Sequence, residues 1–230
     1  MGKTLPQRIG GKSLLFLALL VLILLGTIWP SIKKAQTAGK RTSGLSHCKA
    51  LAGALFTFKT EFGDYPCPRT RDLLISEGAR NLRIGTDANS YLAQLIVSGT
   101  IDSERYFYCE LGKGYHQGDG KIEAPTDLLA PGENSYAYVM NKEEAPLRQT
   151  KNHTPIIMAP IVSGDSVPTF DPTPFDHYYI YGAVDGSAKI GKISQTGLPL
   201  SKGHPHLFST EENSLFENQS PDVKIPIRKY

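Results

Sequence analysis

Residues 14–29 form an uninterrupted apolar run without a single charge, and this run constrains the fold of the chain more than any other feature. With residues 30–32 added, a helix reaches ~28 Å at 1.5 Å per residue, which is close to the thickness of the hydrocarbon layer of a bilayer. Lys33 and Lys34 close the run. The run predicts a membrane-spanning helix over residues 14–32. The residues that we expect to anchor it are Leu14, Leu17, Leu20, Leu24, Trp29 and Pro30.

The main alternative for this run is a cleaved secretory signal peptide, since Lys3, Arg8 and Lys12 resemble the basic start of such a segment. Three observations favour the anchor. The apolar run is longer than that of a usual signal peptide, two lysines follow it, and residues 35–38 are a poor cleavage site.

Charge is distributed unevenly along the chain. Residues 1–60 carry nine Lys/Arg and no Asp/Glu, and the first acidic residue is Glu61. The rest of the chain has 16 Lys/Arg and 22 Asp/Glu, a net charge of −6. A basic stem below a mildly acidic head fits a protein held at an anionic membrane surface. Nucleic acid is not predicted as a partner, because the basic residues flank an apolar span instead of interleaving with aromatic ones.

A second helix is predicted after the span. Apolar residues recur three or four apart from Leu45 to Phe62, which gives a single stripe that we expect to cover a sheet. Whether the span and this stem form one bent helix or two helices remains open, because Gly39 and Gly44 weaken the link between them. The stem must end at residues 63–68, where Gly63 can cap it and two prolines cannot continue it.

Beyond the stem we predict a short helix over residues 87–97, capped by Asp87, with Leu92, Leu95 and Ile96 facing inward. Strands are predicted at residues 105–110, 135–140, 155–162 and 178–193. The last of these is a hairpin turning at Asp185-Gly186, where glycine supplies the positive φ of a tight turn. The polar C-terminal residues are expected to be irregular.

These elements predict an α+β protein with a long N-terminal transmembrane helix that extends into a soluble head containing a small antiparallel β-sheet. The predicted segments are a basic N-terminus, a transmembrane helix, a stem helix, a head domain and an irregular tail. Their respective bounds are residues 1–13, 14–32, 33–62, 63–200 and 201–230.

The sequence contains no pattern that predicts catalysis, a cofactor or a metal site. The three cysteines have no Cys-x-x-Cys spacing, and none has an obvious histidine partner. His204 and His206 are the one close histidine pair, but no carboxylate or cysteine stands at ligand spacing. The position of Asp185 in the hairpin turn is explained by turn geometry alone, so this residue is not predicted to act as an acid or base. We therefore predict that the protein is not an enzyme.

Four features follow one another between residues 12 and 68: the apolar run, Pro30, the segment Lys33-Lys34-Ala35-Gln36, and a helix ending in Gly63-Asp64-Tyr65-Pro66. In this order the chain resembles the type IV pilin superfamily, in particular pseudopilin-like proteins related to the major pseudopilin of type II secretion. Later segments are similar to a large-loop subgroup whose last hairpin carries an Asp-Gly turn; they are residues 91–95, 106–109, 134–138 and 181–187.

The resemblance implies a pilin-like fold and a single-pass protein of the bacterial inner membrane with its C-terminal domain in the periplasm. Its implied partners are the lipid bilayer and other pilin-like subunits or inner-membrane components of a secretion system. An oxidising compartment would allow a disulfide between Cys67 and Cys109, leaving Cys48 on the helix.

Two departures from the family pattern bear on function. The family's processing site is a glycine followed by an aromatic residue and, soon after, a glutamate, whereas Gly10-Gly11 here precedes Lys12-Ser13. We therefore expect that prepilin peptidase does not mature the chain, which keeps Met1 or Gly2 as its N-terminus. The acidic calcium loop of the major pseudopilin is also missing.

Two functions follow as expectations. The first is a structural or accessory subunit of a type II secretion or type IV pilus-like assembly. The alternative is a membrane-tethered periplasmic binding or enzyme domain that uses a pilin-like scaffold and does not polymerise.

Overall fold

The computed structural model describes residues 11–80, 82–122, 128–147, 151–163, 167–217 and 219–229. The chain divides into two compact units, residues 1–39 and residues 40–230. Each unit is described by itself below. The second unit is an α+β head that contains the sheet and the hydrophobic core.

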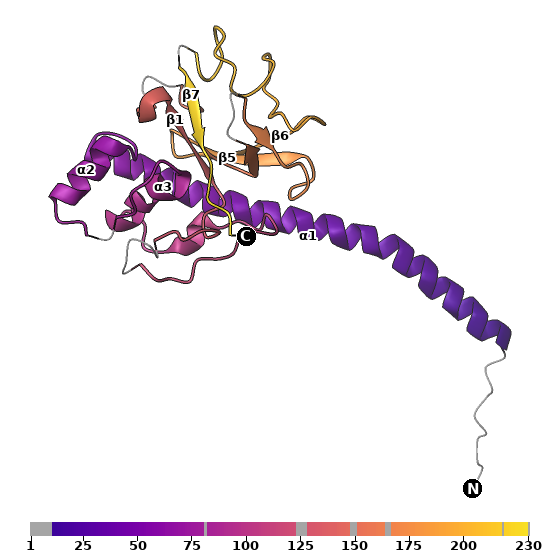
Figure 1. The fold of residues 1–230 in the computed structure, drawn as a ribbon. Helices are drawn as coiled ribbons and strands as arrows, with labels where there is room; N and C mark the ends of the chain where they lie inside the picture. Colours follow the sequence, from indigo (N-terminus) through magenta and orange to yellow (C-terminus); the bar gives the residue numbers. More distant parts are fainter. Residues whose placement is uncertain are drawn as a thin grey trace. The chain divides into compact units, whose positions relative to one another are not determined.

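Helix α1, Gly11–Phe62, is a single helix of 52 residues that continues through Pro30 (Figure 1). The two glycines that left its continuity open, Gly39 and Gly44, both lie within it. The helix ends where the sequence predicts. Gly63 adopts a φ of +79°, and its N–H donates to the carbonyl of Lys59 at 2.9 Å, which closes the last turn.

Two shorter helices follow. The helix predicted over residues 87–97 is confirmed as α3, Ala88–Val97, and the Asp87 carboxylate accepts a hydrogen bond from the N–H of Ser90 at 3.0 Å. Leu92, Leu95 and Ile96 are buried, as expected. Helix α2, Pro68–Ser76, was not predicted. Pro68 stands in the first turn of α2, where its missing N–H costs nothing. The proline that cannot continue the stem helix therefore begins the next helix.

Five strands form an antiparallel sheet in the order β6-β5-β2-β1-β7. The predicted hairpin is confirmed, because β5 pairs with β6 through the turn at Asp185-Gly186, where Gly186 has a φ of +77°. The strands are β1 (Ala137–Asn141), β2 (Pro155–Ala159), β5 (Tyr178–Ala183), β6 (Ala188–Lys192) and β7 (Pro221–Lys224). A separate ribbon pairs β3 (Ile161–Ser163) with β4 (Thr169–Phe170).

Three sequence predictions are corrected by these elements. The aromatic run at residues 105–110 is not a strand: Glu104–Phe107 is a 3₁₀ helix, η1, and another short one, η2, spans Lys142–Glu144. The strand predicted over residues 155–162 is divided between β2 and β3. The C-terminal tail is not wholly irregular, because β7 pairs with β1 and forms an edge of the sheet.

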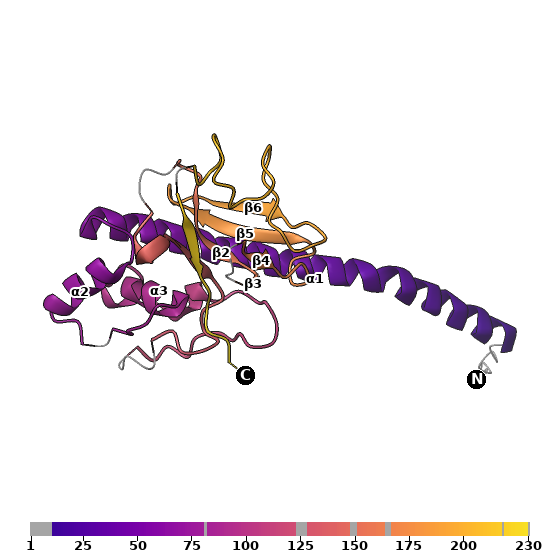
Figure 2. The same cartoon turned by 45° about the horizontal axis from the view of Figure 1, so that its top comes forward.

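The core of the head lies between the sheet and residues 40–62 of α1, which run alongside it (Figure 2). The apolar stripe of the stem is core as expected, since Cys48, Leu51, Leu55 and Phe58 are fully buried. Two glycines permit the close approach of helix and sheet. A β-carbon on Gly182 would lie 2.8 Å from that of Ala52, and one on Gly44 would lie 3.0 Å from the Ile180 side chain.

The opposite face of the β5–β6 hairpin is covered by the segment between β6 and β7. Tyr179 points to this side, because its ring lies over Gly191 and its hydroxyl donates to the carbonyl of Leu200 at 3.4 Å. Tyr179 is buried, whereas Tyr178 and Tyr181 are half-buried. Tyr179 and Tyr181 share one face of β5, so burial does not simply alternate along this strand.

Candidate functional site

The first unit exposes large apolar side chains along α1. Their exposed fractions run from 43% at Leu20 to 72% at Leu15. A contiguous apolar surface of this kind is normally covered by lipid or by another protein. The exposed members are Leu15, Phe16, Leu19, Leu20, Leu22, Ile23, Ile28, Trp29 and Ile32.

The predicted anchor residues all fall on this part of α1. Leu20, Trp29 and Pro30 are exposed, and the Lys33 ammonium lies 5.8 Å from the centre of the Trp29 ring. The side chains of Leu14, Leu17 and Leu24 lie outside the described residues. A search of the described residues finds no helix with both the length and the apolar character needed to cross a membrane.

The Gly-Asp-Tyr-Pro turn after α1 is tied to the sheet by two buried phenols. The Tyr65 hydroxyl donates to the carbonyl of Val184 at 2.9 Å, next to the hairpin turn. The Tyr138 hydroxyl of β1 donates to the carbonyl of Pro66 at 2.8 Å. Burial raises the pKa of Tyr65 to about 12, with a smaller contribution from the negative charge of Asp185. The turn therefore fixes the end of α1 against β1 and β5.

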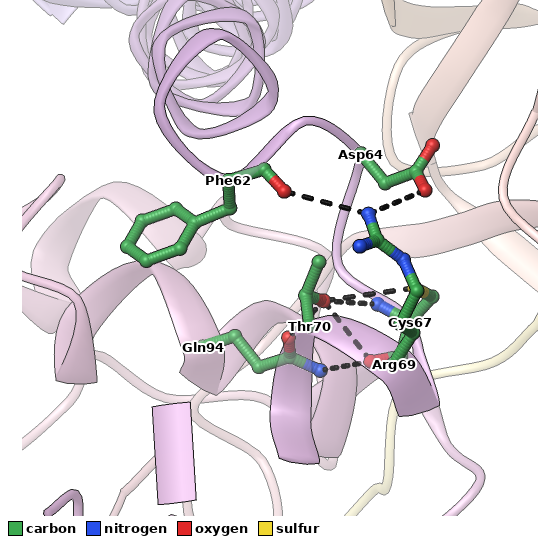
Figure 3. Close-up of polar contacts among 6 residues, drawn as sticks. All are labelled: Phe62, Asp64, Cys67, Arg69, Thr70 and Gln94. Atoms are coloured by element: carbon green, nitrogen blue, oxygen red, sulfur yellow. Dashed lines mark hydrogen bonds and ion pairs between the residues drawn. The ribbon is translucent and has the colours of Figure 1, made fainter. Parts of the chain in front are cut away.

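A polar network joins the same turn to α2 and α3 (Figure 3). The Thr70 hydroxyl donates to the side-chain oxygen of Gln94 at 2.7 Å and accepts from the N–H of Cys67 at 2.9 Å. The Gln94 amide donates to the carbonyl of Cys67 at 3.2 Å. Arg69 extends the network to the surface, where it pairs with Asp64 at 2.6 Å. Thr70 and Gln94 are fully buried and their polar atoms have hydrogen-bond partners, so a structural role accounts for this network.

All three cysteines are buried free thiols. The predicted partners Cys67 and Cys109 have different neighbours: Cys67 contacts Thr70, whereas Cys109 accepts at its carbonyl from the Ser135 hydroxyl at 3.1 Å and lies beside α1 at Gly44. Burial raises the pKa of the Cys48 thiol well above its usual range, and the proximity of Cys109 raises it further. In the fold Cys109 is therefore associated with Cys48.

Asp185 acts in the hairpin turn as predicted and also pairs with a histidine. Its carboxylate accepts from the N–H and the hydroxyl of Ser187 at 2.9 Å and 2.6 Å, which stabilises the turn before Gly186. The Nδ1 atom of His153 lies 2.9 Å from the other carboxylate oxygen. Burial acts to raise the pKa of Asp185, but the bonds from Ser187 and His153 outweigh it and the pKa is lowered.

A pocket of about 550 Å³ lies over the outer face of the β5–β6 hairpin. Tyr181 and Lys189, which are cross-strand neighbours, contribute to its floor. The segment from Leu200 to Leu215 forms its wall, and His153 stands at its edge. This volume falls within the range of ligand-binding sites, ~300–1,000 Å³.

Three carboxylates gather in the loops between α3 and β1. Glu104, Asp119 and Glu133 place one oxygen each within 4.8 Å of the others. Oxygen ligands of this type suit Ca²⁺ or Mg²⁺. Backbone hydrogen bonds, however, already account for the two buried carboxylates: Glu104 accepts from Gly120 and Leu129, and Glu133 accepts from Asp119 and Ala130. Burial raises the pKa of the Glu104 carboxyl, although its hydrogen bonds from the backbone act to lower the pKa.

Sequence reasoning missed the pocket. The period-two pattern of β5 places Tyr179 and Tyr181 on one face, and Lys189 follows from the hairpin register. No sequence signal indicates that residues 200–215 return to cover that face. His204 was singled out as half of a histidine pair, but its position in the pocket wall depends on that return.

Comparison of the chain with protein-family models, with curated proteins and with solved structures finds no match.

Proposed function

We propose that the protein is a membrane-anchored pilin-like subunit, structural or accessory, of a type II secretion or type IV pilus-like assembly. The observation that supports this most is the difference in burial between the two parts of α1. Its first part exposes apolar side chains, whereas residues 45–62 bury their apolar stripe against a sheet. A helix of this kind needs a lipid or protein cover for the first part only.

In this proposal the bilayer covers residues 14–32, and Lys3, Arg8 and Lys12 remain on the cytoplasmic side. The chain from Lys33 onward, the stem and the head, then faces the periplasm. The basic stem of the chain, with no acidic residue before Glu61, adds attraction to anionic lipid of ~1 kcal/mol for each Lys or Arg near the surface.

A second candidate is a tethered binding domain that does not polymerise. The absence of an acidic residue in the first 60 positions favours it, because a new N-terminal amine buried between helices would have no partner charge. The pocket over the β5–β6 hairpin favours it as well. Both candidates share the anchor and differ in what surrounds it.

Alkaline carbonate extraction of bacterial membranes tests the anchor. We expect the full chain to stay in the membrane pellet and the variant Leu20→Arg/Ile23→Arg to be lost from it, because a charge at the centre of a span costs ~2.5–3.5 kcal/mol on insertion scales. Ile84→Arg is the matched control, since Ile84 is as exposed as Leu15 but lies in the head. A wild-type chain found in the soluble fraction, or shortened there by about 4 kDa, would contradict the anchor.

Photo-crosslinking from position 20 or 23 in native membranes then separates the two candidates. A subunit of a filament-like assembly is expected to crosslink to copies of itself or to other pilin-like proteins, whereas a non-polymerising tether reaches lipid alone. Intact mass spectrometry of the extracted chain tests processing. We expect an N-terminus at Met1 or Gly2, and a species that begins at Gly11 or Lys12 with a methylated amine would restore ordinary filament assembly.

A further inference from the structure

The pocket over the β5–β6 hairpin combines an aromatic surface with a positive rim. The rings of Tyr179 and Tyr181 stack at 5.7 Å between centres with 26° between their planes. Tyr179 is buried beneath the covering segment, while Tyr181 is half-buried and keeps part of its ring open to the pocket. An open aromatic ring offers a negatively polarised face to C–H groups or cations.

The aromatic floor is rigid. The Tyr179 ring also packs on Phe170 at 5.1 Å, and it occupies the space that a side chain at position 191 would need: a β-carbon on Gly191 would overlap the ring. Glycine at this position therefore lets the ring lie flat across the neighbouring strand. A surface held in this way loses little freedom when a ligand binds.

The charge of the pocket comes from two lysines. The described residues that line the pocket include these two lysines and no Asp or Glu. Asp185 and Glu211 lie outside the lining, 2.9 Å from His153 and 3.5 Å from His204. Within the part of the chain that the structure describes, Lys189 and Lys202 have no ion-pair partner. The lining thus carries two positive formal charges and no negative one, in a chain whose residues 61–230 have a net charge of −6.

We propose that this pocket binds an acidic sugar, a pyranose ring that carries a carboxylate. The C–H face of the ring packs on Tyr181, and the carboxylate pairs with Lys189 and Lys202. Groups that can hydrogen-bond to sugar hydroxyls also line the pocket, namely Ser201, His204 and Asn213. An acidic peptide would satisfy the lysines but would not use the ring face or this set of hydroxyl-binding groups.

The inference goes beyond the proposed anchoring function and does not depend on it, because every residue involved belongs to the head. Isothermal titration calorimetry of the full chain in a detergent without sugar groups tests it, with trigalacturonate as the acidic sugar. Maltotriose serves as the uncharged sugar and hexaglutamate as the acidic peptide. We expect trigalacturonate to bind, more weakly at 0.5 M than at 0.05 M NaCl, and the other two to bind at least about tenfold more weakly.

Two sets of variants locate the site. Lys189→Gln/Lys202→Gln is expected to weaken trigalacturonate binding about tenfold, the combined loss of two exposed charge pairs. Tyr181→Leu is expected to weaken it as well. The matched control is Lys113→Gln/Lys192→Gln, which removes the same charge outside the pocket: Lys192 lies on β6 but pairs with Tyr178 on the other face.

Four results would overturn the proposal. Equal binding of hexaglutamate would assign the pocket to acidic peptides, and equal binding of maltotriose would remove the role of the lysines. Loss of binding in the control double variant to the same extent would show attraction by overall charge. Absence of trigalacturonate binding to a chain that unfolds cooperatively would refute the acidic-sugar site directly.

Discussion

The substitution Tyr65→Phe tests whether the turn after α1 is held by its phenol. The Tyr65 hydroxyl donates to the carbonyl of Val184 at 2.9 Å, and the Tyr65 side chain is 1% exposed. Phenylalanine fills nearly the same space, so the substitution removes one hydrogen bond and leaves a buried carbonyl without this donor. The expected loss in the free energy of unfolding is about 1–3 kcal/mol.

Thermal unfolding of the full chain in detergent, followed by near-ultraviolet circular dichroism, measures this loss. For a head of this size each kcal/mol corresponds to about 2–4 °C in Tm. Tyr106→Phe is the control, because the Tyr106 hydroxyl accepts a hydrogen bond from Arg105 at the surface. We expect the control to change stability by less than about 0.5 kcal/mol. Equal Tm values for the two variants would refute the role given to the Tyr65 hydroxyl.

Two further predictions concern ionisable groups in the core. Burial raises the pKa values of Tyr65, Tyr136 and Tyr138. The stability gained by keeping these phenols neutral is therefore complete below the unfolded pKa of about 10 and is lost as pH rises through the folded pKa values. Absorbance at 295 nm should show these phenols ionising together with unfolding, and their ionisation in the folded chain would contradict this prediction. Burial also raises the pKa of Cys109 to about 12, and Cys48 and Cys67 are equally buried. Ellman's reagent should therefore react with no thiol before denaturation and with three afterwards, whereas a Cys67–Cys109 disulfide would leave one.

Local chemistry made several parts of this fold predictable. The end of α1 follows from Gly63 and the prolines after it, and the start of α3 follows from one carboxylate at Asp87. The hairpin follows from Asp185-Gly186 between two alternating runs. In each case the deciding hydrogen bond or backbone angle lies within a few residues of the element that it defines.

The failures have a common cause in contacts between distant residues. Residues 105–110 have strand-forming side chains, but the nearby carbonyls and N–H groups pair with other segments: the N–H of Ser135 donates to Phe107 at 2.8 Å. The sequence predicts an irregular tail where β7 lies, because the partner strand β1 stands some eighty residues earlier in the chain. Such pairings depend on where the chain returns, which no local propensity encodes.

By itself, the sequence determined the α+β class, the apolar start of α1, the buried stripe of its second half and the hairpin, because side-chain periodicity and turn residues act locally. Only the tertiary structure placed Cys109 beside Cys48 and folded residues 200–215 over Tyr181 and Lys189. The pocket exists because His153, the β5–β6 hairpin and residues 200–215 meet on one face of the sheet. Their meeting depends on packing of the whole head, to which each segment contributes only part of the stabilising contacts.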